Sequence, residues 1–161
     1  MSIDPRAHSS ERIPAPEPLP HVSRRALKRV TNPLPVPTHC RYCGGHVELI
    51  NNSRIYRREY GEAYVGLHPS TDIPLGTLAT AALRKDRNDS KAIFHKLKEQ
   101  RGFSRSLAYQ WLAGKMGITV DKCHFGWFDQ DECALAAKLC TEDLAANSAM
   151  AAAFKKARTR A

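Results

Sequence analysis

Proline is concentrated at the start of this chain. Eight of its ten prolines lie within the first 37 residues, between Pro5 and Pro37. Proline lacks a backbone donor and clashes with the preceding helical turn, so this segment cannot form long helices. It also carries too little apolar surface to offset the entropy of ordering. We therefore predict a mostly disordered, Pro-rich basic arm over residues 1–38.

The rest of the sequence is typical of one folded domain and a tail. The chain has 161 residues, of which 42% are hydrophobic, and this is enough for one core of ordinary size. Residues 141–161 are rich in alanine, the best helix former, and contain four basic side chains. The predicted organisation is an arm at 1–38, a zinc-finger-like α+β domain at 39–140 and an Ala-rich basic helical tail at 141–161.

The composition indicates a soluble protein with an anionic partner. Lys and Arg number 25 against 16 Asp and Glu, which gives a net charge of +9 and favours nucleic acid as the partner. No apolar run reaches the ~18 residues of a membrane span, and the N-terminus has no apolar signal core. We expect a cytoplasmic protein without membrane contact. Its five cysteines then indicate metal ligands or buried thiols before disulfides.

Two short alternations of apolar and polar residues predict a β-hairpin. They cover residues 47–50 and 54–57, and the polar residues 51–53 separate them. Residues 63–66 are a candidate third strand. A loop punctuated by proline and glycine follows at residues 68–76, and we expect Thr71 or Asp72 to bond local backbone amides there.

Helical segments follow the predicted sheet. The first begins at Thr77 or Thr80 and continues to about residue 100. The second has Ser104 as its N-cap and ends at Gly117, which is a favoured C-terminal stop.

A third helix completes the predicted fold. Asp129 and Glu132 form a variant capping box at its start. The sequence thus predicts a small α+β fold, with a zinc-ribbon-like knuckle and β-hairpin sheet followed by two or three packed helices. Most of the core is expected to come from Leu83, Phe94, Leu97, Ala108, Trp111, Leu112, Ile118, Phe125 and Phe128.

One C-x2-C motif carries the strongest chemical signal. Cys40 and Cys43 have the spacing of a zinc knuckle, in which a tight turn brings two thiolates to one ion, and Gly44-Gly45 lets the backbone turn away. A closed zinc site needs four ligands, and the chain has no second C-x2-C. A metal-free knuckle and a redox pair are the alternatives to zinc.

Histidines are the candidates for the missing ligands. His68, after the third predicted strand, is the first choice. His46 would extend the knuckle to C-x2-C-x2-H, His39 is adjacent but sterically awkward, and Cys123-His124 would have to fold back. The predicted metal ligands are therefore Cys40, Cys43 and His68, with zinc as the cofactor.

The chain resembles a zinc-finger-containing domain family of unknown function found in phages, prophages and bacteria. The resemblance spans about residues 40–133. The stretches that carry it are Cys40-Arg-Tyr-Cys-Gly-Gly45, Ala63-Tyr-Val-Gly-Leu-His-Pro-Ser-Thr-Asp-Ile-Pro-Leu-Gly-Thr-Leu-Ala79, Ser104-Arg-Ser-Leu-Ala-Tyr-Gln-Trp-Leu-Ala113 with Met116-Gly-Ile118, and Lys122-Cys-His-Phe-Gly-Trp-Phe-Asp129. It implies a zinc site and a phage or mobile-element type of protein that acts in the host cytoplasm.

The chain departs from the family pattern at one place. The resemblance implies a second Cys-x-x-Cys before the Ala-Tyr-Val-Gly stretch, but here Tyr60-Gly-Glu continues directly into residues 63–66. Leu67 stands where a cysteine is common. A four-cysteine site is therefore excluded at that place, and the site is either rebuilt with histidines or has lost zinc.

Basic residues near aromatic ones are the candidate nucleic-acid contacts. Arg54, Arg57 and Arg58 accompany two tyrosines on the predicted hairpin, and Arg84 and Lys85 lie on the first long helix. Guanidinium groups bind phosphate oxygens in a bidentate manner, and tyrosines can stack on bases. We predict a small accessory protein that binds DNA or RNA through these residues.

Three other functions are alternatives to this prediction. A phage-type adaptor or inhibitor acting by protein contact is the alternative, with Phe125, Trp127 and Phe128 either core or a docking patch. A helix-turn-helix over residues 104–127 is disfavoured because this segment looks like core. We expect no enzymatic activity, because the neighbours Cys123 and His124 point apart, and no familiar catalytic motif surrounds His68 and Asp72.

Overall fold

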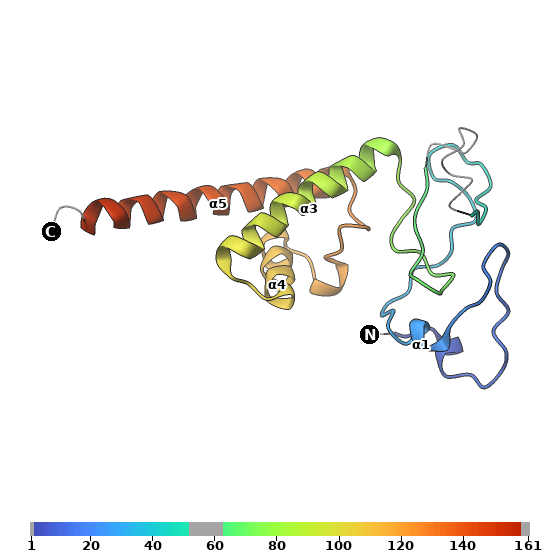
Figure 1. Cartoon of the computed structure of the whole chain (residues 1–161). Helices are drawn as coiled ribbons and strands as arrows, with labels where there is room; N and C mark the ends of the chain where they lie inside the picture. The colour runs from blue at the N-terminus through green and yellow to red at the C-terminus, as the bar shows by residue number, and fades with distance from the viewer. Residues whose placement is uncertain (1, 52–62, 159–161) are drawn as a thin grey trace. The chain divides into compact units, whose positions relative to one another are not determined.

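The chain folds as two compact units in the computed structural model. The first unit is Met1–Ala81 and the second is Ala82–Ala161. The structure describes residues 2–51 and 63–158 (Figure 1). None of the helices in these ranges has an apolar stretch that could span a bilayer. The predicted division into an arm, a domain and a tail stays a prediction.

Three long helices make up the second unit. They are α3 (Ala81–Arg101), α4 (Arg105–Met116) and α5 (Gln130–Arg158), with a short 3-10 turn, η2 (Val120–Lys122), after α4 (Figure 1). The predicted helix signals are confirmed for α4, because the Ser104 hydroxyl accepts the Leu107 amide at 3.2 Å and Gly117 adopts a left-handed φ of 69°. They are also confirmed for α5, where Asp129 and Glu132 exchange two hydrogen bonds of 2.9 and 2.8 Å.

An aromatic cluster forms the centre of the second unit. The Phe94 ring on α3 lies 5.0 Å from Tyr109 on α4 and 5.3 Å from Phe125, and Phe125 lies 5.2 Å from Phe128. Both Phe125 and Phe128 are buried, which confirms the core prediction for these two residues. Seven of the nine predicted core residues are buried, and Trp111 and Ile118 are partly exposed.

The first unit is built mainly from turns. Its described residues contain a 3-10 turn, η1 (Pro5–Ala7), and a short helix, α1 (Arg24–Leu27). A small apolar cluster joins these elements to a later loop, and its buried members are Ala7, Leu27, Val30 and Ile73. The Ser23 amide also donates to the Ser70 carbonyl at 2.9 Å. The start of the chain therefore packs on residues 70–73.

The predicted α+β class is wrong. Residues 2–51 and 63–158 contain four isolated β-bridges and no strand, so they hold neither a hairpin sheet nor a zinc ribbon. Residues 47–50 form no ladder, and their expected partner at 54–57 lies outside the described residues. Residues 63–66 form one bridge, between Tyr64 and Ala79.

The next bridge along the chain shows why these pairings do not extend. It joins Leu67 to Pro74, and proline has no amide hydrogen to donate to a ladder. Pro69 lies within the loop that this bridge closes, and Gly76 follows it. The Leu67–Pro74 bridge therefore closes a loop and does not begin a sheet.

Replacing Arg87 tests how the second unit is held together. Arg87 is only 8% exposed, and its Nε donates to the Phe128 carbonyl at 2.8 Å. Arg87→Met removes this donor and leaves a buried acceptor without it, so the free energy of unfolding should fall by about 1–3 kcal/mol. Urea unfolding followed by tryptophan fluorescence measures this, because Trp111 and Trp127 are the only two tryptophans in the chain.

Lys91→Met is the matched control for this prediction. It makes the same change of a cation to methionine on the same helix, at an exposed position, and should alter the free energy of unfolding by no more than about 0.5 kcal/mol. Equal losses in the two variants would contradict the assigned role of Arg87.

Candidate metal centre and its surroundings

The Cys40–Cys43 segment forms a tight turn closed by backbone hydrogen bonds. The Gly44 amide donates to the Cys40 carbonyl at 2.8 Å, and the Cys40 amide donates to the Gly45 carbonyl at 2.8 Å. Gly44 has a φ of +71°, which L side chains rarely adopt. An antiparallel bridge between His39 and His46 closes the base of the turn. The predicted knuckle geometry is therefore present without the predicted ribbon.

The turn favours the thiolate form of Cys40. The backbone amides of Tyr42 and Cys43 donate hydrogen bonds to its sulfur, the Cys43 side chain adds a further hydrogen bond, and the charge of Arg41 acts in the same direction. Together these groups lower the pKa of the Cys40 thiol below its usual value of 9.0. The thiolate is the form that binds metals, so the turn is chemically suited to hold one.

Two sulfurs are nevertheless the only donors that the structure gathers there. His39 and His46 lie beside the turn with their rings 5.7 Å apart. Within residues 2–51 and 63–158, however, no three His, Cys, Asp or Glu side chains form a group that could hold a metal ion. Cys40, Cys43 and His68 do not form one either, and the assignment of His68 as a ligand stays a prediction.

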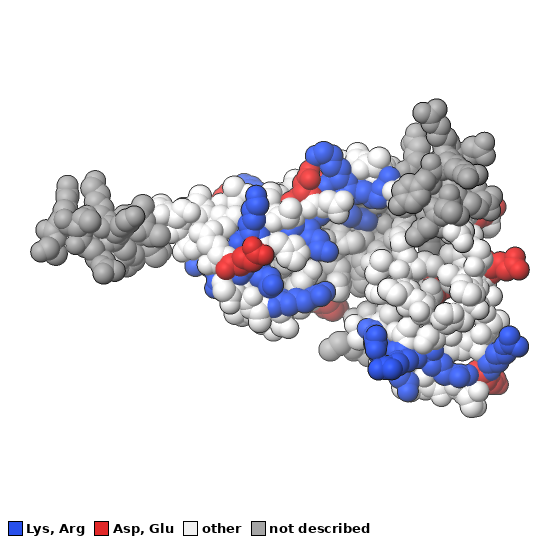
Figure 2. All heavy atoms as spheres, viewed as in Figure 1, with Lys and Arg blue, Asp and Glu red and all other residues white. Residues whose placement is uncertain are grey.

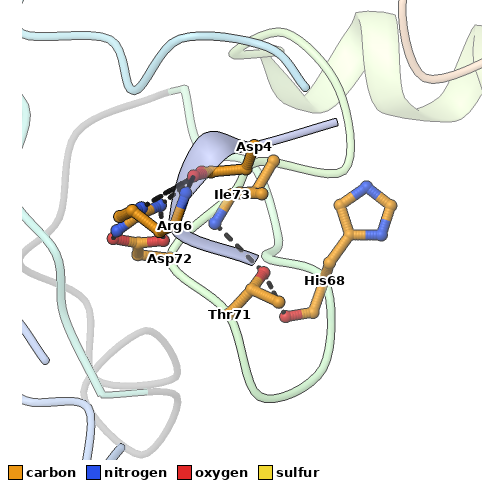
Figure 3. A network of polar contacts seen from close by, with 6 residues as sticks. All are labelled: Asp4, Arg6, His68, Thr71, Asp72 and Ile73. Carbon is orange, nitrogen blue, oxygen red and sulfur yellow. Dashed lines mark hydrogen bonds and ion pairs between the residues drawn. The ribbon is translucent and has the colours of Figure 1, made fainter. Parts of the chain in front are cut away.

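His68 belongs to a hydrogen-bonded loop. Its carbonyl accepts the Thr71 hydroxyl at 2.9 Å, and the Thr71 oxygen in turn accepts the Ile73 amide at 3.1 Å. This confirms the expected bond from Thr71 to a local amide. Figure 3 shows the His68 imidazole pointing away from the neighbouring charged residues. Burial lowers the pKa of His68 and so favours the neutral ring.

Arg6 joins the start of the chain to the same loop. Its guanidinium donates two hydrogen bonds of 2.8 Å to Asp72 and also pairs with Asp4 at 2.7 Å (Figure 3). Both carboxylates have a pKa below the usual 3.8, first because of the hydrogen bond from Arg6. We call Asp4, Arg6 and Asp72 the Arg6 clamp. It holds in place the loop that carries His68.

The other three cysteines are buried thiols of the second unit. Cys123, Cys133 and Cys140 are at most 2% exposed. Burial raises the pKa of Cys123 to about 11 and that of Cys140 to about 12. These thiols therefore stay protonated at neutral pH and pack as small apolar side chains.

The predicted nucleic-acid contacts divide into two groups. Arg54, Arg57 and Arg58 lie outside the described residues. Arg84 and Lys85 lie on α3, where Lys85 is an exposed side chain that pairs with Asp89 at 2.5 Å. Neither group is tested as a phosphate contact.

Sequence reasoning groups Lys91 with the basic residues of this helix but overlooks Lys98. Lys91 and Lys98 follow Arg84 at intervals of seven residues, which is close to two helical turns. The heptad spacing was a visible signal. This spacing shows which basic residues share an outward face only once the buried face of the helix is known.

Comparison with known proteins shows the family. Residues 36–143 match a family described as a zinc-finger-containing domain. The chain belongs to this family. The predicted resemblance is thereby confirmed, and this zinc-finger-containing domain covers the Cys40–Cys43 turn together with α3 and α4. No match was found among curated proteins or solved structures.

The zinc that the family description suggests fits this site only in part. The Cys40–Cys43 turn supplies two suitable donors, whereas a structural zinc site takes four. The described residues of the zinc-finger-containing domain add no third donor to the turn. The described part of one chain therefore presents two of the four ligands of a zinc site.

Thiol labelling tests the division between turn and buried cysteines. In the folded, reduced protein Cys40 and Cys43 should react rapidly with iodoacetamide, with Cys40 the faster because its pKa is lowered. The three buried cysteines should react only on unfolding. Peptide mapping by mass spectrometry after short labelling identifies the modified sites. Rapid labelling of Cys140 in the folded chain would contradict the assignment.

Acid titration tests the Arg6 clamp. Because both carboxylates have lowered pKa values in the folded state, the stability they add is complete above about pH 4 and is lost as the pH falls through those values. Arg6→Met should therefore weaken the protection of the residue 68–73 amides against hydrogen exchange by about 1 kcal/mol near neutral pH, and by less near about pH 3. Arg12→Met, at an exposed position of the same segment, should leave protection unchanged at both pH values.

Proposed function

We propose that this zinc-finger-containing protein is an accessory protein that binds nucleic acid through one face of α3. The observation that carries the proposal is a stripe of basic and polar side chains along that helix. Its members are Arg84, Asn88, Lys91, His95 and Lys98. We call this set the α3 stripe.

The core of the second unit sets the position of the α3 stripe. The buried residues of α3 are Leu83, Arg87, Ser90, Phe94 and Leu97. Each member of the stripe follows one of them directly in sequence, so the stripe lies about 100° around the helix from the buried face. From Arg84 to Lys98 it extends about 21 Å along the axis, at 1.5 Å per residue.

Two lysines of the stripe are available to a ligand. Lys91 and His95 are exposed, and among the described residues Lys91 and Lys98 form no ion pair. Figure 2 shows Lys and Arg side chains gathered over the second unit. A row of cations on a rigid helix is suited to successive phosphates, and the released counterions favour binding.

Aromatic side chains of the second unit add a means to contact bases. The exposed His124 ring lies 4.6 Å from the half-buried Trp127, and the Arg105 guanidinium lies 5.8 Å from the Tyr109 ring. Rings with an accessible face can stack on unpaired bases without regard to sequence. This supports a sequence-tolerant mode of binding, in which phosphate contacts supply most of the affinity.

Removing two charges from the stripe tests the proposal. Lys91→Gln combined with Lys98→Gln should weaken binding to single- and double-stranded oligonucleotides of mixed sequence. If each lysine neutralises one phosphate of a duplex, the slope of log K against log salt should fall in magnitude by about 2. Fluorescence anisotropy at several salt concentrations measures both quantities.

Lys85→Gln combined with Lys96→Gln is the matched control. These changes remove the same charge from the same helix, about 100° further around it, and Lys85 is already paired with Asp89. The control should bind more tightly than the stripe variant and keep most of the salt dependence. Equal losses would contradict the assignment to this face. Absence of nucleic-acid binding even at low salt would favour the protein-adaptor alternative.

A further inference from the structure

The Cys40–Cys43 turn is organised as a chelate before any metal is present. Two backbone hydrogen bonds of 2.8 Å fix the turn, and the amides of Tyr42 and Cys43 point at the Cys40 sulfur. The Cys43 side chain is also in hydrogen-bond contact with Cys40. Both sulfurs are thus held on one side of a single turn, so little ordering entropy is lost when one ion binds them together.

Among the described residues, the same chain does not supply the other half of a tetrahedral site. Only three further cysteines exist, and Cys123, Cys133 and Cys140 are buried. No histidine among the described residues joins the two sulfurs in a group of three. Residues 52–62 contain neither cysteine nor histidine. A structural zinc site with two ligands is incomplete, because this ion takes four.

The turn is open to a second macromolecule. Cys43 is exposed and Cys40 is partly exposed. A Cβ atom placed on Gly44, at the tip of the turn, would have no other atom within 4 Å. Tyr42 is 43% exposed, and the Arg41 guanidinium lies 5.0 Å from its ring. The surface beside the sulfurs therefore combines a partly exposed aromatic ring with a cation.

We propose that the Cys40–Cys43 turn binds zinc as one half of a site shared by two copies of this chain. Two identical turns related by a twofold axis supply four thiolates, which complete the tetrahedral coordination of one ion. Four thiolates and one Zn²⁺ carry a net charge of −2. The two Arg41 side chains, one from each copy, together add a charge of +2 next to them, so the assembled site is close to neutral. Of the possible occupants, a second copy supplies the missing thiolates without any other partner.

Metal stoichiometry and mass test the shared site directly. The full-length chain is kept reduced with a phosphine, freed of metal by a chelator and titrated with zinc chloride. Native mass spectrometry and light scattering then give the zinc content and the mass. We expect one zinc ion for two chains and a mass twice the 18.0 kDa of one chain, with return to 18.0 kDa when the chelator is added back. The cobalt-loaded protein should show the charge-transfer absorption of four thiolates.

Variants separate the turn from other sources of zinc binding. Cys43→Ser should abolish both zinc binding and the dimer. Cys133→Ser makes the same chemical change at a buried thiol and should keep both. His39→Ala combined with His46→Ala should also keep both, since neither imidazole is a ligand in a four-thiolate site.

Several results would overturn the proposal, and the wild-type chain alone provides three of them. These are one zinc ion bound to a monomer, a dimer that persists in the chelator, and no zinc binding at all. Loss of zinc in the double histidine variant would also overturn it, because the site would then be completed within one chain. Oligonucleotide affinity is measured separately, so this proposal and the proposed function can fail independently.

Discussion

Burial of one face of α3 determines where every other side chain of that helix lies. Leu83, Phe94 and Leu97 contribute apolar surface to this buried face. Arg87 also lies on it, and its Nε donates to the Phe128 carbonyl. Because a helix turns about 100° per residue, fixing these positions also fixes the α3 stripe. The surface assigned to phosphates is thus a geometric consequence of the packing of the core, and it needs no loop to hold it in place.

The first unit depends on a different kind of constraint. Its described residues contain neither a long helix nor a strand, so their backbone groups are satisfied by turns and single bridges. Its apolar cluster is small, and the Arg6 clamp adds charged hydrogen bonds across 66 residues of sequence. The Cys40–Cys43 turn lies in this unit. A unit with so little core is one in which a bound ion adds stability, as in other small metal-binding domains.

Local signals in the sequence were sufficient to predict the helices. The Ser104 cap, the Gly117 stop and the Asp129–Glu132 box act over three or four residues, and all three have the expected geometry. Phe94, Phe125 and Phe128 were also predicted as core residues, whereas Tyr109, which joins their cluster, was not. Strand formation depends instead on a partner elsewhere in the chain, and residues 47–50 carry the alternation without forming a ladder.

The contact between Arg6 and Asp72 could not be predicted because nothing in the sequence pairs two charges so far apart. At the candidate metal site the turn was predictable from Cys40 and Cys43. The structure was needed to show that no third donor among the described residues joins them.

A turn that presents two thiolates and no third donor also affects how the protein responds to its own abundance. When one ion joins two chains, the extent of assembly depends on the square of the concentration of free chains and only linearly on that of the metal. At low copy number the turn would stay empty even where zinc is plentiful. A modest rise in expression would then fill it over a narrow range. The fraction of turns that hold zinc would then depend at least as strongly on the concentration of the protein as on that of the metal.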